Sequence, residues 1–413
     1  MSGGVTPMNI ARCRPHDQAG FRRDGAPLSL PSVNAAVLAH RPEIPMVCLR
    51  PAMATAEAAR FVEAFPGSVL YAVKCNPDEA VLRALAAGGI SHFDAASITE
   101  VRLVRRLFPQ ARIHFMHPVK ARSAIRESYR EHGVRDFVLD STDELAKIVD
   151  ETAGAKDLCL IVRLGLAKGG ARLDLSGKFG AFADDAAALL RSCAPHAAKL
   201  GLSFHVGSQC CDPSAWERAL QQADAVIRDA GIRLDVLDVG GGFPVPYPDM
   251  QPPPLDAFMT AIAHGVARMA LPEGCVLWCE PGRALVAACQ SLVVQVQARR
   301  GDLLYINDGV YGTLSDAGVL GFRYPCRLIK AAGFSTGRIG DFSFYGPTCD
   351  SLDRMQGPFL LPDDVTEGDW IEIGQLGAYG TYLRTGFNGF EDVIRVAVED
   401  FTIRRFAPRG KAA

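Results

Sequence analysis

The chain lacks an excess of charge of either sign. Its 44 Lys and Arg residues nearly balance 46 Asp and Glu residues, so the formal net charge is −2 with histidine neutral. Proteins that hold nucleic acid or an anionic membrane surface generally need a strong positive field. We therefore expect neither a nucleic-acid partner nor a membrane partner.

Long hydrophobic runs are also lacking. No stretch approaches the roughly 18 consecutive apolar residues that span a bilayer. Residues 1–30 contain several arginines and aspartates and no apolar segment of the kind found in secretory signals. We therefore expect a cytoplasmic protein.

Clusters of cysteine are lacking, and the spacing of the cysteines matches no structural framework. The 12 cysteines are spread over 413 residues, which excludes a small disulfide-stapled scaffold. Neither Cys210–Cys211 nor Cys275/Cys279 has the paired spacing of a zinc site. We predict free, mostly buried thiols and no metal site.

What the chain does contain is enough apolar sequence for a large core. Hydrophobic residues make up 48% and charged residues 22%, which excludes a disordered chain and a coiled coil. Its length allows about two or three domains, or one barrel with an appendage. The 40 glycines predict many tight loops.

Short apolar strands alternate with amphipathic helical segments between about residues 68 and 283. We predict strands at 68–74, 90–96, 112–117, 136–140, 158–164, 202–207, 234–239 and 276–280. This alternation favours a parallel sheet, and eight such units over about 250 residues are typical of a TIM-type (β/α)8 barrel. An open doubly wound sheet is the competing interpretation, because periodicity alone does not decide between them.

The pattern changes after residue 284. Short strands separated by Gly, Pro and Asp turns follow, and long helical patterns are lacking. We predict a barrel domain at 46–284 and a C-terminal β domain at 285–413. An N-terminal segment at 1–45 needs a partner and is expected to pack on the β domain.

Polar residues stand at the ends of the predicted strands, where a barrel places its chemistry. They are Lys74, Asp94, Arg163, His205, the triplet Gly240, Gly241 and Gly242, Glu280 and, just beyond it, Arg283. Because the carboxyl ends of barrel strands share one face, we expect these residues to meet there.

The residue types in this set suit pyridoxal phosphate (PLP). Burial in an apolar strand disfavours the ammonium form of Lys74, which could then form a Schiff base. The glycine triplet exposes N–H groups to a phosphate, Arg283 can bind that phosphate, and Glu280 can hold a protonated ring nitrogen. The sequence GGGFP is not GxGxxG, so a dinucleotide site has weak support.

A series of motifs in the same order carries a family resemblance. The motifs are YAVKCNP (71–77), FDAAS (93–97), KFG (178–180), HVGSQC (205–210), DVGGGFP (238–244), EPGRALV (280–286), NDGVYG (307–312), GPTCDSLD (346–353) and GAYG (377–380). The chain closely resembles the ornithine decarboxylase-like group of the fold type III, alanine racemase-like, PLP-dependent decarboxylases. The resemblance implies a PLP-binding barrel, a C-terminal β domain and a head-to-tail homodimer with shared active sites.

The resemblance also implies roles for residues of the barrel. Lys74 would form the Schiff base with PLP, His205 would stack on the cofactor ring, and Glu280 would bond the pyridine nitrogen. Racemases of this fold have an arginine there, so Glu280 favours decarboxylation. The residues that would hold the phosphate are Ser208, Gly240, Gly241, Gly242, Arg283 and Tyr379. Asp94 and Arg163 would support the site.

The second domain is expected to complete the site. Cys349 resembles the acid that protonates Cα after CO2 loss, reaching in from the partner subunit; a thiol suits this role because its pKa lies near working pH. Asp350 resembles the carboxylate that pairs with the distal ammonium of ornithine, and Tyr311 is a further expected substrate contact. Lys178 and Asp353 resemble a salt bridge across the dimer interface.

One stretch departs from the family pattern. After NDGVYG the family has a Tyr-Asp pair that binds the distal amine, and residues 313–328 contain no such pair at that place. Asp316 is the nearest acid and is the expected substrate contact in place of that pair, and Arg323 adds a positive charge nearby. We expect L-ornithine as substrate, converted to putrescine for polyamine synthesis, with L-lysine and L-arginine behind it.

Two alternatives stay open at the level of sequence. A diaminopimelate decarboxylase would usually have Cys-Glu-Ser where this chain has Cys349-Asp350-Ser351, although Arg323 could bind a distal carboxylate. A non-catalytic homologue that binds regulatory partners would have lost catalytic residues, whereas Lys74 and the other expected residues are present.

Overall fold

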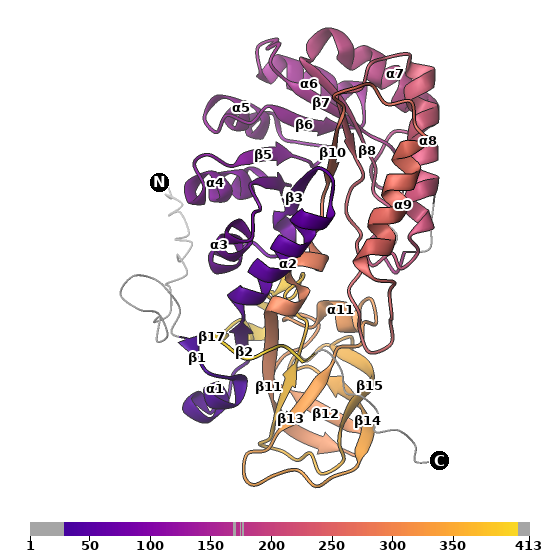
Figure 1. Cartoon of the computed structure of the whole chain (residues 1–413). Helices are drawn as coiled ribbons and strands as arrows, with labels where there is room; N and C mark the ends of the chain where they lie inside the picture. Colours follow the sequence, from indigo (N-terminus) through magenta and orange to yellow (C-terminus); the bar gives the residue numbers. More distant parts are fainter. Residues whose placement is uncertain (1–28, 168–170, 174, 176, 404–413) are drawn as a thin grey trace, which may run out of the picture.

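The computed structural model describes residues 29–403 except 168–170, 174 and 176. Most of the N-terminal segment expected at 1–45 therefore lies outside the described residues. Within them, a barrel occupies the upper part of Figure 1 and a second sheet the lower part. No helix in the described ranges combines the length and apolarity that a membrane crossing requires.

Eight parallel strands close the barrel in the order β10-β3-β4-β5-β6-β7-β8-β9. The strands are β3 (Ser68–Ala72), β4 (His92–Ala95), β5 (Arg112–Phe115), β6 (Asp136–Leu139), β7 (Cys159–Arg163), β8 (Lys199–Ser203), β9 (Val236–Asp238) and β10 (Val276–Cys279). The predicted barrel is confirmed, and the open sheet is wrong because β10 pairs with β3 and leaves no free edge.

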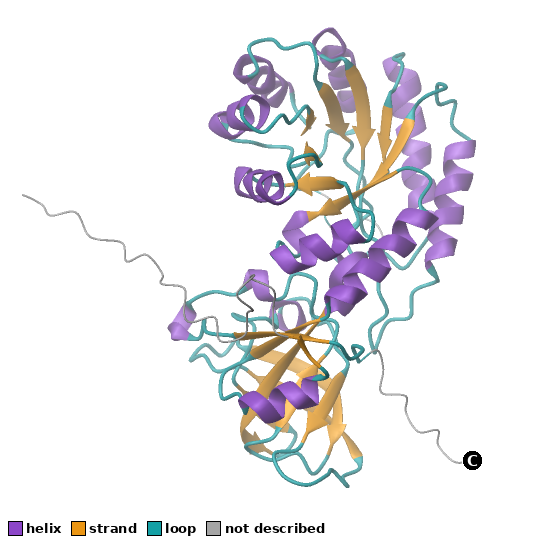
Figure 2. Ribbon diagram, turned by 60° about the vertical axis from the view of Figure 1, so that its left-hand side comes forward, coloured by secondary structure: helices purple, strands orange, loops and turns teal. Residues whose placement is uncertain are grey.

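Helices cover the outside of this barrel, as Figure 2 shows. They are α2 (Pro51–Ala64), α3 (Glu79–Ala87), α4 (Ile98–Leu107), α5 (Arg122–Arg130), α6 (Thr142–Glu151), α7 (Ala183–Cys193), α8 (Ser214–Ala230), α9 (Leu255–Ala267) and α10 (Arg283–Val286). Several begin at a side-chain cap: Ser97 accepts a hydrogen bond from the Glu100 N–H, and Ser141 accepts one from the Glu144 N–H.

Residues along each strand alternate between two buried clusters. In β7, Leu160 and Val162 belong to the main core, which includes residues of the surrounding helices. Cys159 and Ile161 belong instead to a separate cluster that includes Trp278. Because successive strand side chains point to opposite faces, the second cluster is the filling of the barrel interior.

The second sheet has nine strands. The strands are β1 (Ser29–Leu30), β2 (Met46–Leu49), β11 (Gln290–Arg300), β12 (Leu303–Ile306), β13 (Cys326–Ile329), β14 (Ile339–Tyr345), β15 (Arg354–Pro362), β16 (Trp370–Ile373) and β17 (Ile394–Val398). Two further helices, α1 (Val33–His40) and α11 (Ser315–Gly318), accompany it.

The start of the chain crosses between the two parts. Strand β2 pairs with β11 and β17, although the barrel domain was expected to begin at residue 46. The indigo strands β1 and β2 accordingly lie beside yellow β17 in Figure 1. The chain therefore enters the barrel only after contributing strands to the second sheet.

A buried arginine follows β2 and joins it to distant segments. Arg50 is 2% exposed, and its guanidinium donates to Glu372 Oε1 at 2.9 Å, Ser291 Oγ at 2.9 Å and the Asp400 carbonyl at 3.0 Å. Glu372 is 1% exposed and also pairs with Arg327. Removing Arg50 would leave a buried carboxylate without one of its cations.

We expect Arg50→Met to lower the free energy of unfolding by about 3–5 kcal/mol, because breaking a buried pair leaves the buried Glu372 carboxylate with one cation fewer. Urea denaturation of the two proteins measures this difference. Arg60→Met is the matched control: Arg60 is 57% exposed and pairs with Glu57, so its loss should cost below about 1 kcal/mol. Equal effects of the two substitutions would contradict the expectation.

Candidate active site

A cavity of about 530 Å³ opens at the carboxyl ends of the barrel strands. Of the residues predicted from the sequence, those that line it are Lys74, Arg163, Lys178, His205, Ser208, Gly242, Glu280, Arg283, Asp316 and Tyr379. Residues far apart in sequence meet there because parallel strands present their ends on one rim.

Lys74 follows β3 and is held by a buried acid. Its Nζ lies 3.1 Å from Asp94 Oδ2; the lysine side chain is 45% exposed and the aspartate side chain 1%. Desolvation lowers the pKa of Lys74, but the charge and hydrogen bond of Asp94 outweigh it, so the pKa of Lys74 lies above the ordinary value. The expected disfavoured ammonium is therefore wrong for this geometry, because the ion pair wins over desolvation.

His205 contributes a neutral ring to the cavity. The Gly207 N–H donates to its Nδ1 at 3.0 Å, and burial, followed by the charges of Arg163 and Lys74, holds the pKa of His205 well below its ordinary value. The remaining proton then belongs on Nε2. A Cβ on Gly241 would lie 3.1 Å from this Nε2 and 2.4 Å from the Glu280 carbonyl oxygen, so glycine leaves room for the ring.

Glu280 is a buried acid with an unused oxygen. It is 4% exposed, and among the described residues its Oε1 has no hydrogen-bond partner. Burial, followed by the charges of Asp238 and Asp94, holds the pKa of Glu280 well above its ordinary value. A buried carboxyl of this kind is costly unless a donor meets it, and a protonated pyridine nitrogen is such a donor.

Arg283 supplies the cationic end of the cavity. It is 5% exposed, with its Nη1 donating to Tyr247 Oη at 3.1 Å and its guanidinium carbon 5.2 Å from the Tyr379 ring centroid. Among the described residues its Nε has no hydrogen-bond partner. The guanidinium of Arg283 is therefore fixed in place and can bind a phosphate. Ser208 and Gly242 line the same cavity.

Asp316 is engaged by this arginine. Its Oδ2 lies 3.0 Å from Arg283 Nη2, and its side chain is 12% exposed. We expected Asp316 to bind the distal amine of the substrate, but its carboxylate is already paired with the cation of the phosphate end. Helix α11, which carries Asp316, brings it there.

Three other predicted residues lie away from this cavity. Cys349 and Asp350 stand between β14 and β15, and Tyr311 Oη donates to Asp350 Oδ2. All cysteines that the structure describes are free, and of these Cys349 alone is exposed. Within one chain these residues therefore form a separate group.

Lys178 and Asp353 are not brought together within the chain. Lys178 lines the cavity, with its Nζ 5.0 Å from the Phe179 ring centroid. Asp353 is 1% exposed, and its carboxylate accepts hydrogen bonds from the Val310 N–H at 2.7 Å and Thr348 Oγ1 at 2.7 Å. Asp353 therefore organises its own loop, which the sequence did not indicate.

Sequence reasoning missed Asp238, which ends β9 two residues before the first glycine of the triplet. It is fully buried, its Oδ1 accepts the Gly240 N–H at 2.8 Å, and burial raises its pKa to about 6. Asp238 is the first residue of the motif DVGGGFP, and this acidic residue near the glycine triplet was the signal that could have identified it. Gly240 and Gly241 flank the cavity without lining it.

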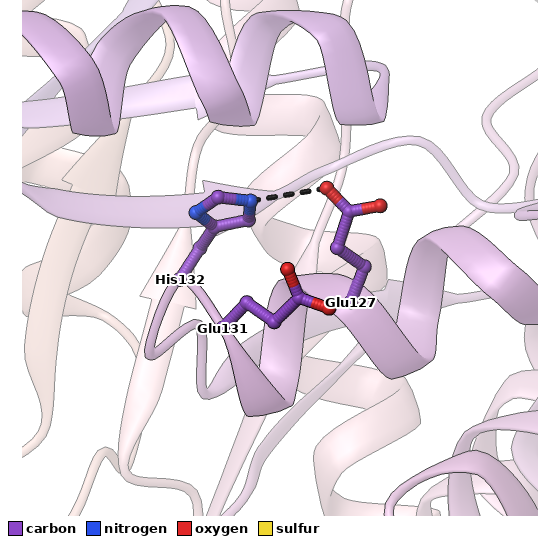
Figure 3. A group of neighbouring side chains, drawn as sticks. All are labelled: Glu127, Glu131 and His132. Carbon is purple, nitrogen blue, oxygen red and sulfur yellow. Dashed lines mark hydrogen bonds and ion pairs between the residues drawn. The ribbon is translucent and has the colours of Figure 1, made fainter.

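A group of possible metal ligands lies elsewhere, at the end of α5. Figure 3 shows Glu127, Glu131 and His132, whose ligand atoms lie within 4.8 Å of one another. Glu127 accepts hydrogen bonds from Arg102 Nε at 2.5 Å and Nη2 at 2.6 Å, and its Oε1 lies 3.1 Å from His132 Nε2. We interpret this group as an ion-pair cluster.

The barrel, its rim lysine, the buried acid with an unused oxygen and the held arginine define a PLP-dependent enzyme of the alanine-racemase type. Residues 53–287 match the family described as pyridoxal-dependent decarboxylase, pyridoxal binding domain, and the chain belongs to this family. It is a PLP-dependent decarboxylase, and the non-catalytic alternative loses its support.

Relatives and solved structures agree with this assignment. The lysine/ornithine decarboxylase of Selenomonas ruminantium is 33% identical over 343 residues, 80% of this chain and 84% of that protein. Ornithine decarboxylase of Neurospora crassa is 33% identical over 382 residues, 80% and 75% respectively.

Two solved structures share the fold over most of both chains. The arginine decarboxylase of Paramecium bursaria Chlorella virus has a TM-score of 0.78 at 26% identity, over 88% of this chain and 99% of that one. The lysine/ornithine decarboxylase of Vibrio vulnificus, complexed with putrescine, has a TM-score of 0.74 at 30% identity, over 89% and 99%.

Proposed function

We propose that this decarboxylase acts on a basic L-amino acid in the cytoplasm, with L-ornithine giving putrescine and CO2. The observation that carries the reaction type is Glu280, a buried acid with an unused oxygen in the cavity. The names of the Selenomonas, Neurospora and Vibrio proteins support a basic substrate.

The proposed roles of the barrel residues follow from their places. Bound PLP supplies an electron sink for the pair left at Cα when CO2 departs. Lys74 would anchor the cofactor, Glu280 would hold the proton on the ring nitrogen, and a neutral His205 would not oppose that positive charge. Arg283 holds the phosphate, and Asp94 keeps Lys74 at the rim.

Cys349 is proposed to donate the proton that replaces CO2 at Cα, acting in the cavity of a partner subunit. Its exposure and its absence from the lining of its own chain's cavity support this arrangement. Exposed apolar residues lie on both sides: Phe182 (70%) on the barrel, and Leu352 (73%) beside Cys349. These exposed residues support a homodimer interface, in which we propose that Cys349 and Asp350 face the cavity of the partner subunit.

Subunit mixing tests this shared site. Cys349→Ala should lower decarboxylation about 10²- to 10⁴-fold, because it removes the general acid. Mixing Lys74→Ala with Cys349→Ala subunits should restore about one quarter of wild-type activity, since about half of the dimers are hybrids with one intact site. No recovery between subunits shown to exchange would reject the shared site.

The distal charge of the substrate is proposed to meet Asp350. The diaminopimelate alternative depends on Arg323, whose Nη1 donates to the Gly321 carbonyl at 2.7 Å and which does not line the cavity. A panel of L-ornithine, L-lysine, L-arginine and diaminopimelate, with the amine products identified, should show ornithine turned over fastest. Preference for diaminopimelate would overturn the basic-substrate proposal.

A further inference from the structure

The segment that carries Cys349 and Asp350, here called the acid loop (346–353), is fixed by contacts from two other segments. The Cys349 N–H donates to Asn388 Oδ1 at 3.1 Å. Tyr311 Oη donates to Asp350, and the Val310 N–H donates to Asp353. The acid loop is therefore placed by residues 308–313 on one side and 384–392 on the other.

Arg384 joins these two supporting segments. Its Nη1 donates to Asp308 Oδ2 at 2.6 Å and to Thr313 Oγ1 at 3.2 Å. On the other side it donates to the carbonyls of Glu391 at 3.0 Å, Phe390 at 3.0 Å and Asp392 at 3.2 Å. The planar fork of arginine allows these directions at once, and a lysine does not.

The central ion pair is buried. The Arg384 side chain is 7% exposed and the Asp308 side chain 0%. Asp308 Oδ1 also accepts the N–H groups of Gly309 and Thr313, each at 2.7 Å, which fixes the turn that leads to Tyr311. Each charge depends on the other, since burial leaves no water to compensate a lost partner.

Asn388 completes the link to Cys349. Its backbone lies in the left-handed region, with φ 55° and ψ 10°, which asparagine tolerates better than most residues. From this bend, the side-chain oxygen of Asn388 accepts the hydrogen bond from the Cys349 N–H. A segment held by Arg384 thus contacts the backbone of the proposed acid, Cys349, itself.

We propose that the Asp308–Arg384 ion pair is a positioning device for Cys349 and Asp350, so that Arg384 acts on the partner's cavity and not on its own. This inference rests on the proposed function, in which the acid loop serves the site around the partner's lysine. The hydrogen bonds of the Arg384 side chain go to residues that do not line the cavity of its own barrel, although the preceding residue, Leu383, does line it.

Subunit mixing assigns Arg384 to one half of the site. Arg384→Met should lower activity about 10- to 100-fold, because the acid is displaced and not removed. Mixed with Lys74→Ala, it should recover to the level of the Cys349→Ala and Lys74→Ala pair. Mixed with Cys349→Ala, it should not rise above the low activity of Arg384→Met alone. The reverse pattern, or equal recovery in both mixtures, would overturn the proposal.

Hydrogen–deuterium exchange provides a readout that does not depend on activity. In Arg384→Met, peptides covering 346–353 should exchange about tenfold faster, because the support of the Cys349 amide is loosened. Arg299→Met is the matched control: Arg299 likewise donates to three carbonyls, those of Gly301, Asp363 and Val365, away from the acid loop. Unchanged exchange in Arg384→Met would overturn the proposal.

A conservative variant keeps the proposal testable if Arg384→Met fails to fold or to dimerise. Arg384→Lys keeps the charge opposite Asp308 and loses the fork, so it should fold, show a smaller defect and fall in the same mixing group. If the Cys349→Ala and Lys74→Ala pair itself fails to recover, the shared site is wrong. In that case exchange in 346–353 still decides whether Arg384 holds the acid loop.

Discussion

Replacing Lys74 by alanine is expected to reduce decarboxylation by about 10³-fold or more, because it removes the amine that is proposed to carry the cofactor covalently. Lys74 is the lysine that Asp94 holds at 3.1 Å on the rim of the cavity. The variant should also lose the visible absorbance of covalently bound PLP. Activity and the absorption spectrum of the purified variant measure both effects.

Lys178 provides the internal comparison for this experiment, since it lines the same cavity. Borohydride reduction of the wild-type enzyme followed by peptide mass mapping should place the cofactor adduct on Lys74. An adduct on Lys178 would refute the assignment. Lys178→Ala should keep the absorbance band, because its contact is with the Phe179 ring and not with Asp94 or Glu280.

Glu280→Gln is expected to lower activity about 10²- to 10³-fold while PLP remains bound. A glutamine has nearly the shape of the glutamate but carries no negative charge to hold a proton on the ring nitrogen. The phosphate end, built on Arg283 and Tyr247, is left intact. An active variant with unchanged turnover would show that the buried acid does not control the reaction.

The same substitution has a pH-dependent effect on the cofactor-free protein. The pKa of Glu280 in the folded chain lies well above 4.5, so on raising the pH the unfolded chain loses this proton before the folded one does. Wild-type stability is therefore lost progressively as the pH rises above 4.5, by up to about 1.4 kcal/mol per pH unit. The Glu280→Gln variant does not lose stability in this way, because glutamine has no proton to titrate in this pH range.

Urea denaturation of cofactor-free wild type and Glu280→Gln between pH 5 and pH 8 measures the difference. The stability of the variant relative to wild type should grow with pH until the raised pKa of the folded protein is passed. Adding PLP should shrink the difference, because a positive ring nitrogen would let Glu280 ionise. A difference that narrows with rising pH in the cofactor-free proteins would contradict the assignment.

Much of the barrel and its rim could be predicted from sequence. Residues such as Lys74, His205 and Glu280 sit at or just beyond strand ends, and the closed barrel brings all strand ends to one rim. Strand–helix alternation is a local property, so it survives without knowledge of the fold. Membership of the decarboxylase family follows from the same local motifs.

The direction of the Lys74 pKa could not be predicted from the strand in which it lies. The apolar neighbours in sequence indicated a disfavoured ammonium, whereas Asp94 from the next strand reverses the result. Likewise Asp316 is an unassigned acid in sequence, and only the packing of α11 pairs it with Arg283.

The sequence alone therefore determined the strand–helix alternation, the cofactor class and the residues at the strand ends, because these depend on periodicity and on order along the chain. Closure of the strands into a barrel was decided by the pairing of β10 with β3. The tertiary structure decided which remote segments meet. It places β2 in the second sheet, buries Asp353 in its loop, and brings Arg384 to Asp308, 76 residues away. Ion pairs of this kind depend on distances of a few ångströms between remote segments, and no local pattern encodes those distances.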